Sequence, residues 1–154
     1  MRTTLLTLLF LISSLMSSAQ TFDIDTTLYN GNNRINVVIL GDGYILSELP
    51  KLVSDATNFS NYFFSISPYK EYKDYFNIFT IKVPSNESGA SHPGTATDVT
   101  EPDHPISSVD NYFGSTFDQH GIHRLIVPTK LNEVTNVLAN NIPTYNQVLI
   151  LVNT

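Results

Sequence analysis

The sequence predicts an α/β domain with a mixed, largely parallel β-sheet and helices on its faces. Apolar runs of strand length alternate with segments whose apolar residues recur every three or four positions. Such alternation implies crossover connections, which place successive strands parallel to one another. The 154 residues contain no cysteine, so no disulfide can support the fold, but a 42% apolar content is enough for a core.

The first 19 residues have the composition of an export signal. Arg2 precedes an apolar run over residues 5–12. Ser17-Ser18-Ala19 then fits the small-x-small cleavage rule, so we expect cleavage between Ala19 and Gln20. The run is too short, and too interrupted by serine, to span about 30 Å of hydrocarbon. Because a lipid-anchored signal needs cysteine, we expect an extracellular or periplasmic protein that is neither a lipoprotein nor stably inserted in a membrane.

The mature chain is predicted to begin with a lead-in over residues 20–33, which ends in an Asn-Gly turn. Residues 34–154 then form the α/β domain. Its first strand, RINVVILG, is apolar with little alternation, as in a strand covered on both faces. A helix is predicted over residues 48–64, with Ser47 as its N-cap and Pro50 in its first turn.

The remaining elements follow from the same patterns. The expected elements are a short helix over 67–75, a strand over 76–84, a polar segment over 85–121, a strand over 123–129, a helix over 131–141 with Leu131, Val134 and Leu138 on one side, and a strand over 147–154. A strand as apolar as residues 148–152 normally lies inside a sheet. We therefore expect the fold to be completed by sequence beyond Thr154.

The charge balance limits the partners. The chain has 14 acidic and 8 basic residues, a net charge of −6, and all the acidic residues follow Ala19. Such a balance argues against nucleic acid and anionic membranes as partners.

Gly41-Asp42-Gly43 follows the first strand, where open α/β sheets place ligands. Position 46 is leucine, so the dinucleotide fingerprint is incomplete, and no Gly-Lys-Ser/Thr follows for a phosphate loop. Two interpretations stay open. In the first, Asp42 binds a cation or orients a histidine. In the second, which is favoured, Asp42 accepts backbone hydrogen bonds in a structural turn.

Four histidines fall in or next to the polar segment: His92, His104, His120 and His123. The stretch DQHGIH puts Asp118, His120 and His123 close together, and a metal ion accepts such donors. However, no helix carries a zinc-ligand pair, and a strand beginning at His123 would point it away from His120. Solvated loop histidines are therefore the favoured interpretation. No serine nucleophile motif is present.

Six stretches together resemble a known family: NRINVVILGDGY, ELPKLVSDATNFSNYFF, PSNESGASHPGTATDVTEP, VDNYFGSTFD, GIHRLIVP and YNQVLILVN. In this order the chain resembles the secreted IgA-peptidase family of zinc metallopeptidases. The resemblance implies a zincin-like catalytic domain, a peptide or protein substrate, and zinc held by an H-E-x-x-H helix downstream of QVLILVN.

No histidine of this chain is followed by glutamate, so no catalytic residue and no zinc ligand is carried over to it. The expectation is an incomplete catalytic domain that is inactive by itself, with zinc bound only by the complete protein. Gly41, Asp42, Gly43 and His92 are expected to line the cleft. The alternative is an exported non-catalytic α/β module that binds glycan or protein through residues 85–121.

Overall fold

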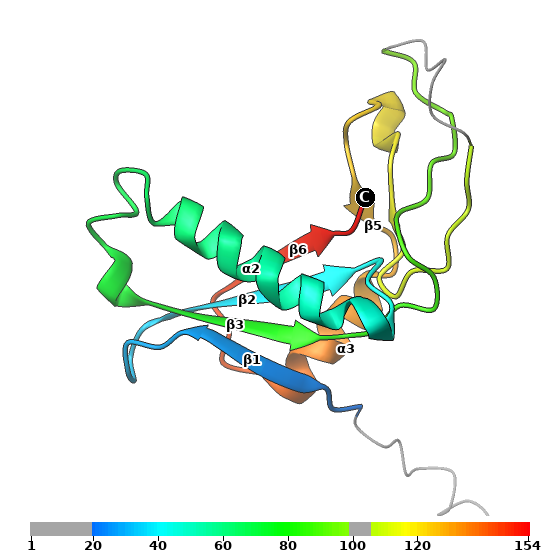
Figure 1. Cartoon of the computed structure of the whole chain (residues 1–154). Coiled ribbons are helices and arrows are strands. Elements are labelled where there is room, and N and C mark those ends of the chain that lie inside the picture. Colours follow the sequence, from blue (N-terminus) through cyan, green and yellow to red (C-terminus); the bar gives the residue numbers. More distant parts are fainter. Residues whose placement is uncertain (1–19, 99–105) are drawn as a thin grey trace, which may run out of the picture.

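The computed structural model describes residues 20–98 and 106–154, so the predicted signal peptide and His104 lie outside the described residues. A four-stranded sheet in the order β1-β3-β2-β6 has one helix on each face (Figure 1). Its elements are β1 (Asp23–Leu28), β2 (Ile35–Asp42), α2 (Leu49–Phe63), β3 (Phe76–Lys82), α3 (Leu131–Asn141) and β6 (Gln147–Val152). Among the described residues, no helix is both long and apolar enough to span a membrane.

The sheet is mixed and mostly parallel, as predicted. β2 pairs in parallel with β3 on one side and β6 on the other, and Val38 faces Phe79 and Val148 across them. β1 runs antiparallel to β3 at the edge. The central place of β2 explains its uninterrupted apolar sequence, because both of its faces are covered.

Two apolar layers sandwich the sheet. Side chains alternate along a strand, so successive residues of β2 contribute to opposite faces. Val38 and Leu40 pack with Val134 and Leu138 of α3, together with Phe113. On the other face, the buried residues are Val37, Ile39, Ala56, Phe64 and Ile78, which lie between the sheet and α2.

Both long helices are confirmed, with differences at their ends. Ser47 is not an N-cap, because it lies inside a short 3₁₀ helix, η1 (Leu46–Glu48), that leads directly into α2. Pro50 occupies the first turn of α2, as predicted. In α3, Leu131 is 61% exposed, and Val137 is buried beside Val134 and Leu138 instead.

The predicted helix over residues 67–75 is wrong. This segment forms turns and one 3₁₀ helix, η2 (Lys73–Tyr75). A short helix needs an apolar face packed against the protein to be stable. Here Tyr69, Tyr72 and Tyr75 are all exposed, so no such face exists.

Two other strand assignments also change. The lead-in contains β1, which the sequence did not suggest. Of the strand predicted over 123–129, only Val127–Pro128 is a strand (β5). It pairs with β4 (Ser115–Thr116) in a separate two-stranded sheet. The backbone N–H of Leu125 donates to the carbonyl of Ile122, which closes a turn where the strand was expected.

β6 is confirmed as a strand, and the expectation that further sequence covers it stays a prediction. Within the described part of the chain it pairs only with β2, at an edge of the sheet. Its residues from Val148 to Val152 are half-buried.

Candidate functional site

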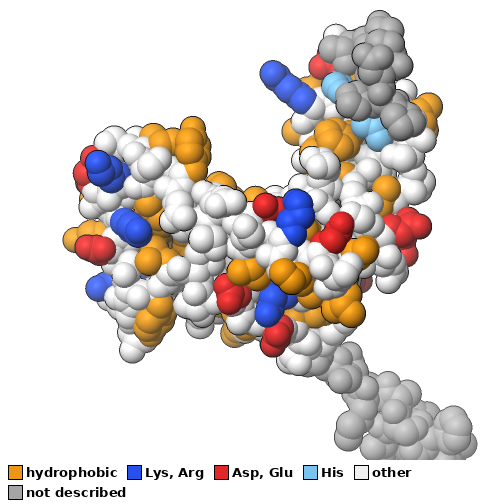
Figure 2. All heavy atoms as spheres, in the orientation of Figure 1, with side chains coloured by type: hydrophobic (Ala, Val, Ile, Leu, Met, Phe, Trp, Pro, Cys, Tyr) orange, Lys and Arg blue, Asp and Glu red, His pale blue; other side chains and the backbone are white. Residues whose placement is uncertain are grey.

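A loop lobe, defined as residues 85–98 and 106–129, stands at the end of the sheet where β2 and β6 finish (Figure 1). The carboxyl ends of parallel strands are where α/β sheets place their ligands. Figure 2 shows histidine side chains on the surface of this lobe and a broad hollow between it and the opposite end of the sheet.

Asp42 fastens the loop lobe to the sheet. Its Oδ1 accepts hydrogen bonds from the backbone N–H groups of Gly43 at 3.1 Å and Phe113 at 3.0 Å. Its Oδ2 accepts one from the N–H of Ser115 at 2.9 Å, and the Ser85 hydroxyl donates to Oδ1 at 3.3 Å. The side chain is fully buried. The interpretation of Asp42 as an acceptor of backbone hydrogen bonds is therefore confirmed.

Gly43 allows two backbone segments to meet. It has a φ of +73°, and a Cβ at this position would lie 2.2 Å from the carbonyl oxygen of Gly89. The N–H of Gly89 donates to the carbonyl of Gly43 at 2.9 Å. Asn153, just after β6, donates to the same carbonyl at 3.0 Å. A glycine is required here both for φ and for space.

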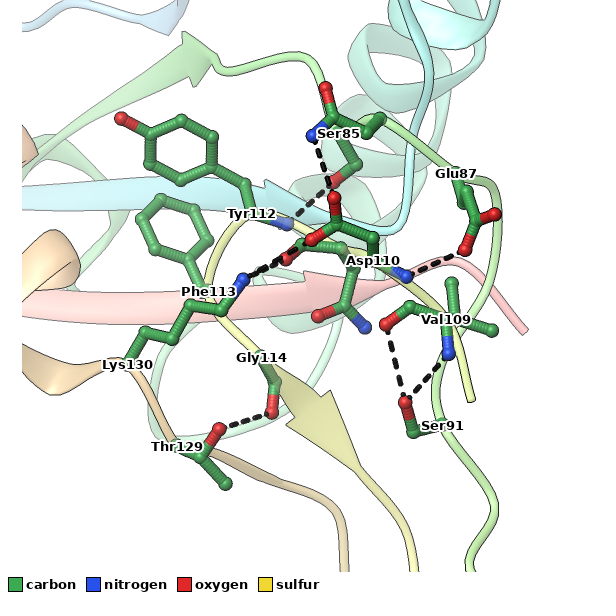
Figure 3. A network of polar contacts seen from close by, with 12 residues as sticks. Ser85, Glu87, Ser91, Val109, Asp110, Tyr112, Phe113, Gly114, Thr129 and Lys130 are labelled. Atoms are coloured by element: carbon green, nitrogen blue, oxygen red, sulfur yellow. Dashed lines mark hydrogen bonds and ion pairs between the residues drawn. The ribbon is translucent and has the colours of Figure 1, made fainter. Parts of the chain in front are cut away.

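A polar network joins the two halves of the loop lobe (Figure 3). The hydroxyl of Ser91 accepts from the N–H of Val109 at 2.9 Å, and the carboxylate of Glu87 accepts from the N–H of Asp110 at 2.7 Å. Hydrogen bonds from Asn86 and Lys130 lower the pKa of the Asp110 carboxyl. These contacts hold the described parts of the loop lobe together although these parts contain little regular secondary structure.

Three side chains meet inside the lobe: His92, Asp118 and His123. The Nδ1 atom of His123 lies 3.3 Å from Asp118 Oδ1, and Nε2 of His92 lies 4.0 Å from the same oxygen. One ligand-type atom from each residue falls within 4.8 Å of the others. His92 is only 7% exposed and Asp118 only 3%.

Neighbouring groups hold the three side chains in place. The N–H of Thr95 donates to Asp118 Oδ2 at 2.8 Å, which turns Oδ1 toward the imidazoles. The two imidazoles meet edge to face with their ring centres 5.3 Å apart, and the ring of Phe117 packs beside both, 5.3 Å from the ring centre of His92 and 6.3 Å from that of His123. The N–H of His123 donates to Asp98 Oδ1 at 2.9 Å.

His92 and His123 open into a cavity of about 520 Å³. Its lining also includes Phe117 and Thr154, so the cavity lies between the loop lobe and the end of β6. Its size is in the range of small-molecule and peptide side-chain sites.

The residues expected to line a cleft separate into two groups. His92 lines the cavity, whereas Gly41, Asp42 and Gly43 are buried and are not among its lining residues. Gln20, the expected mature N-terminus, is exposed, and its carbonyl accepts a hydrogen bond from Asn141. Ala19 lies outside the described residues.

The interpretation of the histidines as solvated is wrong for His92 and His123 and right for His120, which is exposed. His123 lies in a turn and not in a strand, and it turns back onto Asp118. The sequence grouped Asp118 with His120 and His123 because they are neighbours. The third member, His92, comes from a distant segment. The only signal for it in the sequence was its place in PSNESGASHPGTATDVTEP, one of the stretches that resemble the family.

A second charged group lies near the first turns of α2. Lys51 donates to Asp55 Oδ2 at 2.7 Å, and the hydroxyl of Tyr44 donates to the same atom at 2.8 Å. The hydrogen bond from Lys51 is the main cause that lowers the pKa of Asp55. Burial, and then the Asp55 carboxylate, raise the pKa of Tyr44 strongly.

A model of the IgA Peptidase M64 family matches residues 26–154. The matched span includes β2, β3 and β6, both long helices and the whole described loop lobe. No curated protein matches the chain.

Proposed function

The chain belongs to the IgA peptidase M64 family, and we propose that it is the sheet-bearing part of an exported zinc metallo-endopeptidase. The observation that carries this proposal is the family match, which spans the sheet and the loop lobe at its end. Export is supported by the signal-like composition of residues 1–19. The location would then be extracellular or periplasmic.

The zinc centre implied by the resemblance is an H-E-x-x-H helix, and the residues present do not fit it. Neither α2 nor α3 contains a histidine. No histidine in the 154 residues is immediately followed by a glutamate. We therefore propose that residues 1–154 do not hydrolyse peptides by themselves and that the reaction requires such a motif in the same protein.

The substrate is proposed to be a peptide or protein, as the family implies. Two features of the structure support this. The edge of β6 offers backbone hydrogen-bonding groups of the kind to which an extended peptide adds as a further strand. The cavity beside His92 lies at the end of that strand, where a side chain of such a peptide would be accommodated.

The test compares two proteins: residues 20–154 alone, and a protein in which the same residues are continued by a segment with H-E-x-x-H. A fluorescence-quenched peptide library is the substrate. We expect cleavage only by the longer protein, with loss of cleavage in excess chelator or when the motif's glutamate is replaced by glutamine. Chelator-sensitive cleavage by residues 20–154 alone would disprove the proposal.

The alternative is a non-catalytic binding module that uses residues 85–121. The cavity favours it, because several of its lining residues come from this segment. Titration of residues 20–154 with glycans and unstructured peptides distinguishes the two. The binding module is favoured if residues 20–154 bind such a ligand tightly without cleaving it and the natural protein has no H-E-x-x-H segment after them.

A further inference from the structure

We propose that His92, Asp118 and His123 form a binding site for a single Zn²⁺-class cation, separate from the helical motif of the family. The site is built entirely from the loop lobe. Metal binding at this site does not require peptidase activity. The proposal is therefore tested independently of the proposed function.

The first argument is distance. Zinc bonds of about 2.0–2.2 Å in a tetrahedral arrangement separate two ligand atoms by roughly 3.3–3.6 Å. The separation of His123 Nδ1 and Asp118 Oδ1 is 3.3 Å, and that of His92 Nε2 and Asp118 Oδ1 is 4.0 Å. All three donor atoms lie within 4.8 Å of one another, so the most distant pair has to approach by at most about 1.5 Å for one ion to bind all three.

The second argument is the type of donor. Two imidazole nitrogens and one carboxylate oxygen are a common ligand set for zinc. Imidazole also suits copper, nickel and iron, whereas calcium and magnesium require mostly oxygen ligands. The site should therefore bind Zn²⁺ or Co²⁺ and discriminate strongly against Ca²⁺.

The third argument is preorganisation, because hydrogen bonds fix the backbone at His92 and the carboxylate of Asp118. His92 exchanges two backbone hydrogen bonds with Ser107, of 2.8 and 2.9 Å. Asp118 is oriented by the N–H of Thr95, which binds its other oxygen at 2.8 Å. Such outer hydrogen bonds orient carboxylate ligands at metal sites. The backbone at His92 and the Asp118 carboxylate thus need little further ordering when the ion binds.

The fourth argument is access. His92 and His123 line the cavity of about 520 Å³, so an ion and one water molecule can reach the two imidazoles from it. Asp118 does not line the cavity, but its Oδ1 lies 3.3 Å from His123 Nδ1, directly next to this path. Three protein ligands leave the fourth position to solvent. The ion would link residue 92 to the 118–123 turn, and we expect it to stabilise the loop lobe.

The experiment uses residues 20–154, metal-free and without an affinity tag. Calorimetric titration with ZnCl₂ should give a stoichiometry of one, and CoCl₂ should give the visible absorption bands of a four-coordinate cobalt site. A 100-fold excess of Zn²⁺ over its dissociation constant should raise the thermal midpoint by about 5–10 °C. CaCl₂ at the same concentration as ZnCl₂ should give no binding heat in the titration and should not change the thermal midpoint.

The variants are His92→Gln, His123→Gln and Asp118→Asn, with His120→Gln as the matched control because His120 is exposed and outside the cluster. Each of the three should weaken zinc binding at least 30-fold, and His120→Gln should not change it. Circular dichroism verifies folding, and the two histidine variants decide the outcome if Asp118→Asn does not fold. Absence of binding by the folded chain, or unchanged binding in both His92→Gln and His123→Gln, overturns the proposal.

Discussion

The backbone N–H of Ser115 donates a hydrogen bond of 2.9 Å to Oδ2 of Asp42, and this bond joins residues 73 positions apart. Asp42 ends the central strand, and Ser115 begins β4 in the loop lobe. One buried carboxylate thus couples the sheet to the lobe that carries the cavity and the histidines.

Asp42→Asn should lower the free energy of unfolding by about 2–4 kcal/mol, because an amide cannot replace a carboxylate that accepts several backbone hydrogen bonds. Urea denaturation followed by circular dichroism measures the change. Asp74→Asn is the control, since Asp74 is exposed, and it should stay within about 0.5 kcal/mol of the wild type.

In a full-length active relative, the alanine substitution at the position of Asp42 should reduce stability more than it reduces turnover per folded molecule. A loss of activity with an unchanged thermal midpoint would contradict the structural role of this residue.

Gly43→Ala should destabilise the protein by more than about 2 kcal/mol. The added Cβ would lie 2.2 Å from the backbone carbonyl oxygen of Gly89, and φ is +73°. Gly31→Ala has a φ of +99° but no atom within 4 Å of the new Cβ, so it isolates the backbone strain, which costs about 1 kcal/mol. Equal destabilisation of the two variants in urea would show that the contact with Gly89 is unimportant.

Gly41 and Leu52 should show strong coupling. A Cβ on Gly41 would lie 2.5 Å from Cδ2 of Leu52, whose side chain is fully buried. Leu52→Ala alone should cost about 2–4 kcal/mol through the cavity that it leaves. In the double variant the new methyl group enters that cavity, so the double variant should lose at least about 1 kcal/mol less than the sum of the single variants. Additive losses in a double-mutant cycle would contradict the packing described.

Asp55 should contribute to the acid sensitivity of the fold. Its pKa in the folded protein lies below its ordinary value of 3.8, chiefly because of the hydrogen bond from Lys51. The unfolded chain therefore binds the proton more readily, so the stabilisation is complete above about pH 4 and is lost as the pH falls through the folded-state pKa. Asp55→Asn should flatten the loss of stability below pH 4. Parallel urea midpoints for the variant and the wild type across this range would refute the assignment.

Three of the four strands of the sheet, β2, β3 and β6, and both long helices were predictable because local pattern and tertiary environment agree there. The buried, uniformly apolar β2 and the three-to-four periodicity of α2 leave few alternatives. The segment 67–75 has a good cap and proline but lacks a buried face, so local propensity gave the wrong answer.

The cluster of His92, Asp118 and His123 was not predictable from spacing. Its members are brought together by backbone bonds of the loop lobe, among them the hydrogen bond of 2.9 Å from the N–H of Phe117 to the carbonyl of Ser91. Periodicity carries no information about such irregular pairing. The role of Asp42 was easier to anticipate, because an aspartate between glycines after a strand is typical of a hydrogen-bonded turn.

The position of β6 has a practical consequence for handling this polypeptide. Among the described residues one side of that strand carries backbone donors and acceptors without a neighbouring strand, next to half-buried Leu149 and Ile150. Such a border is a template for edge-to-edge self-association. In concentrated solution the purified chain should therefore sediment as dimers and larger species, and a short β-forming peptide that caps this border should return it to the monomer.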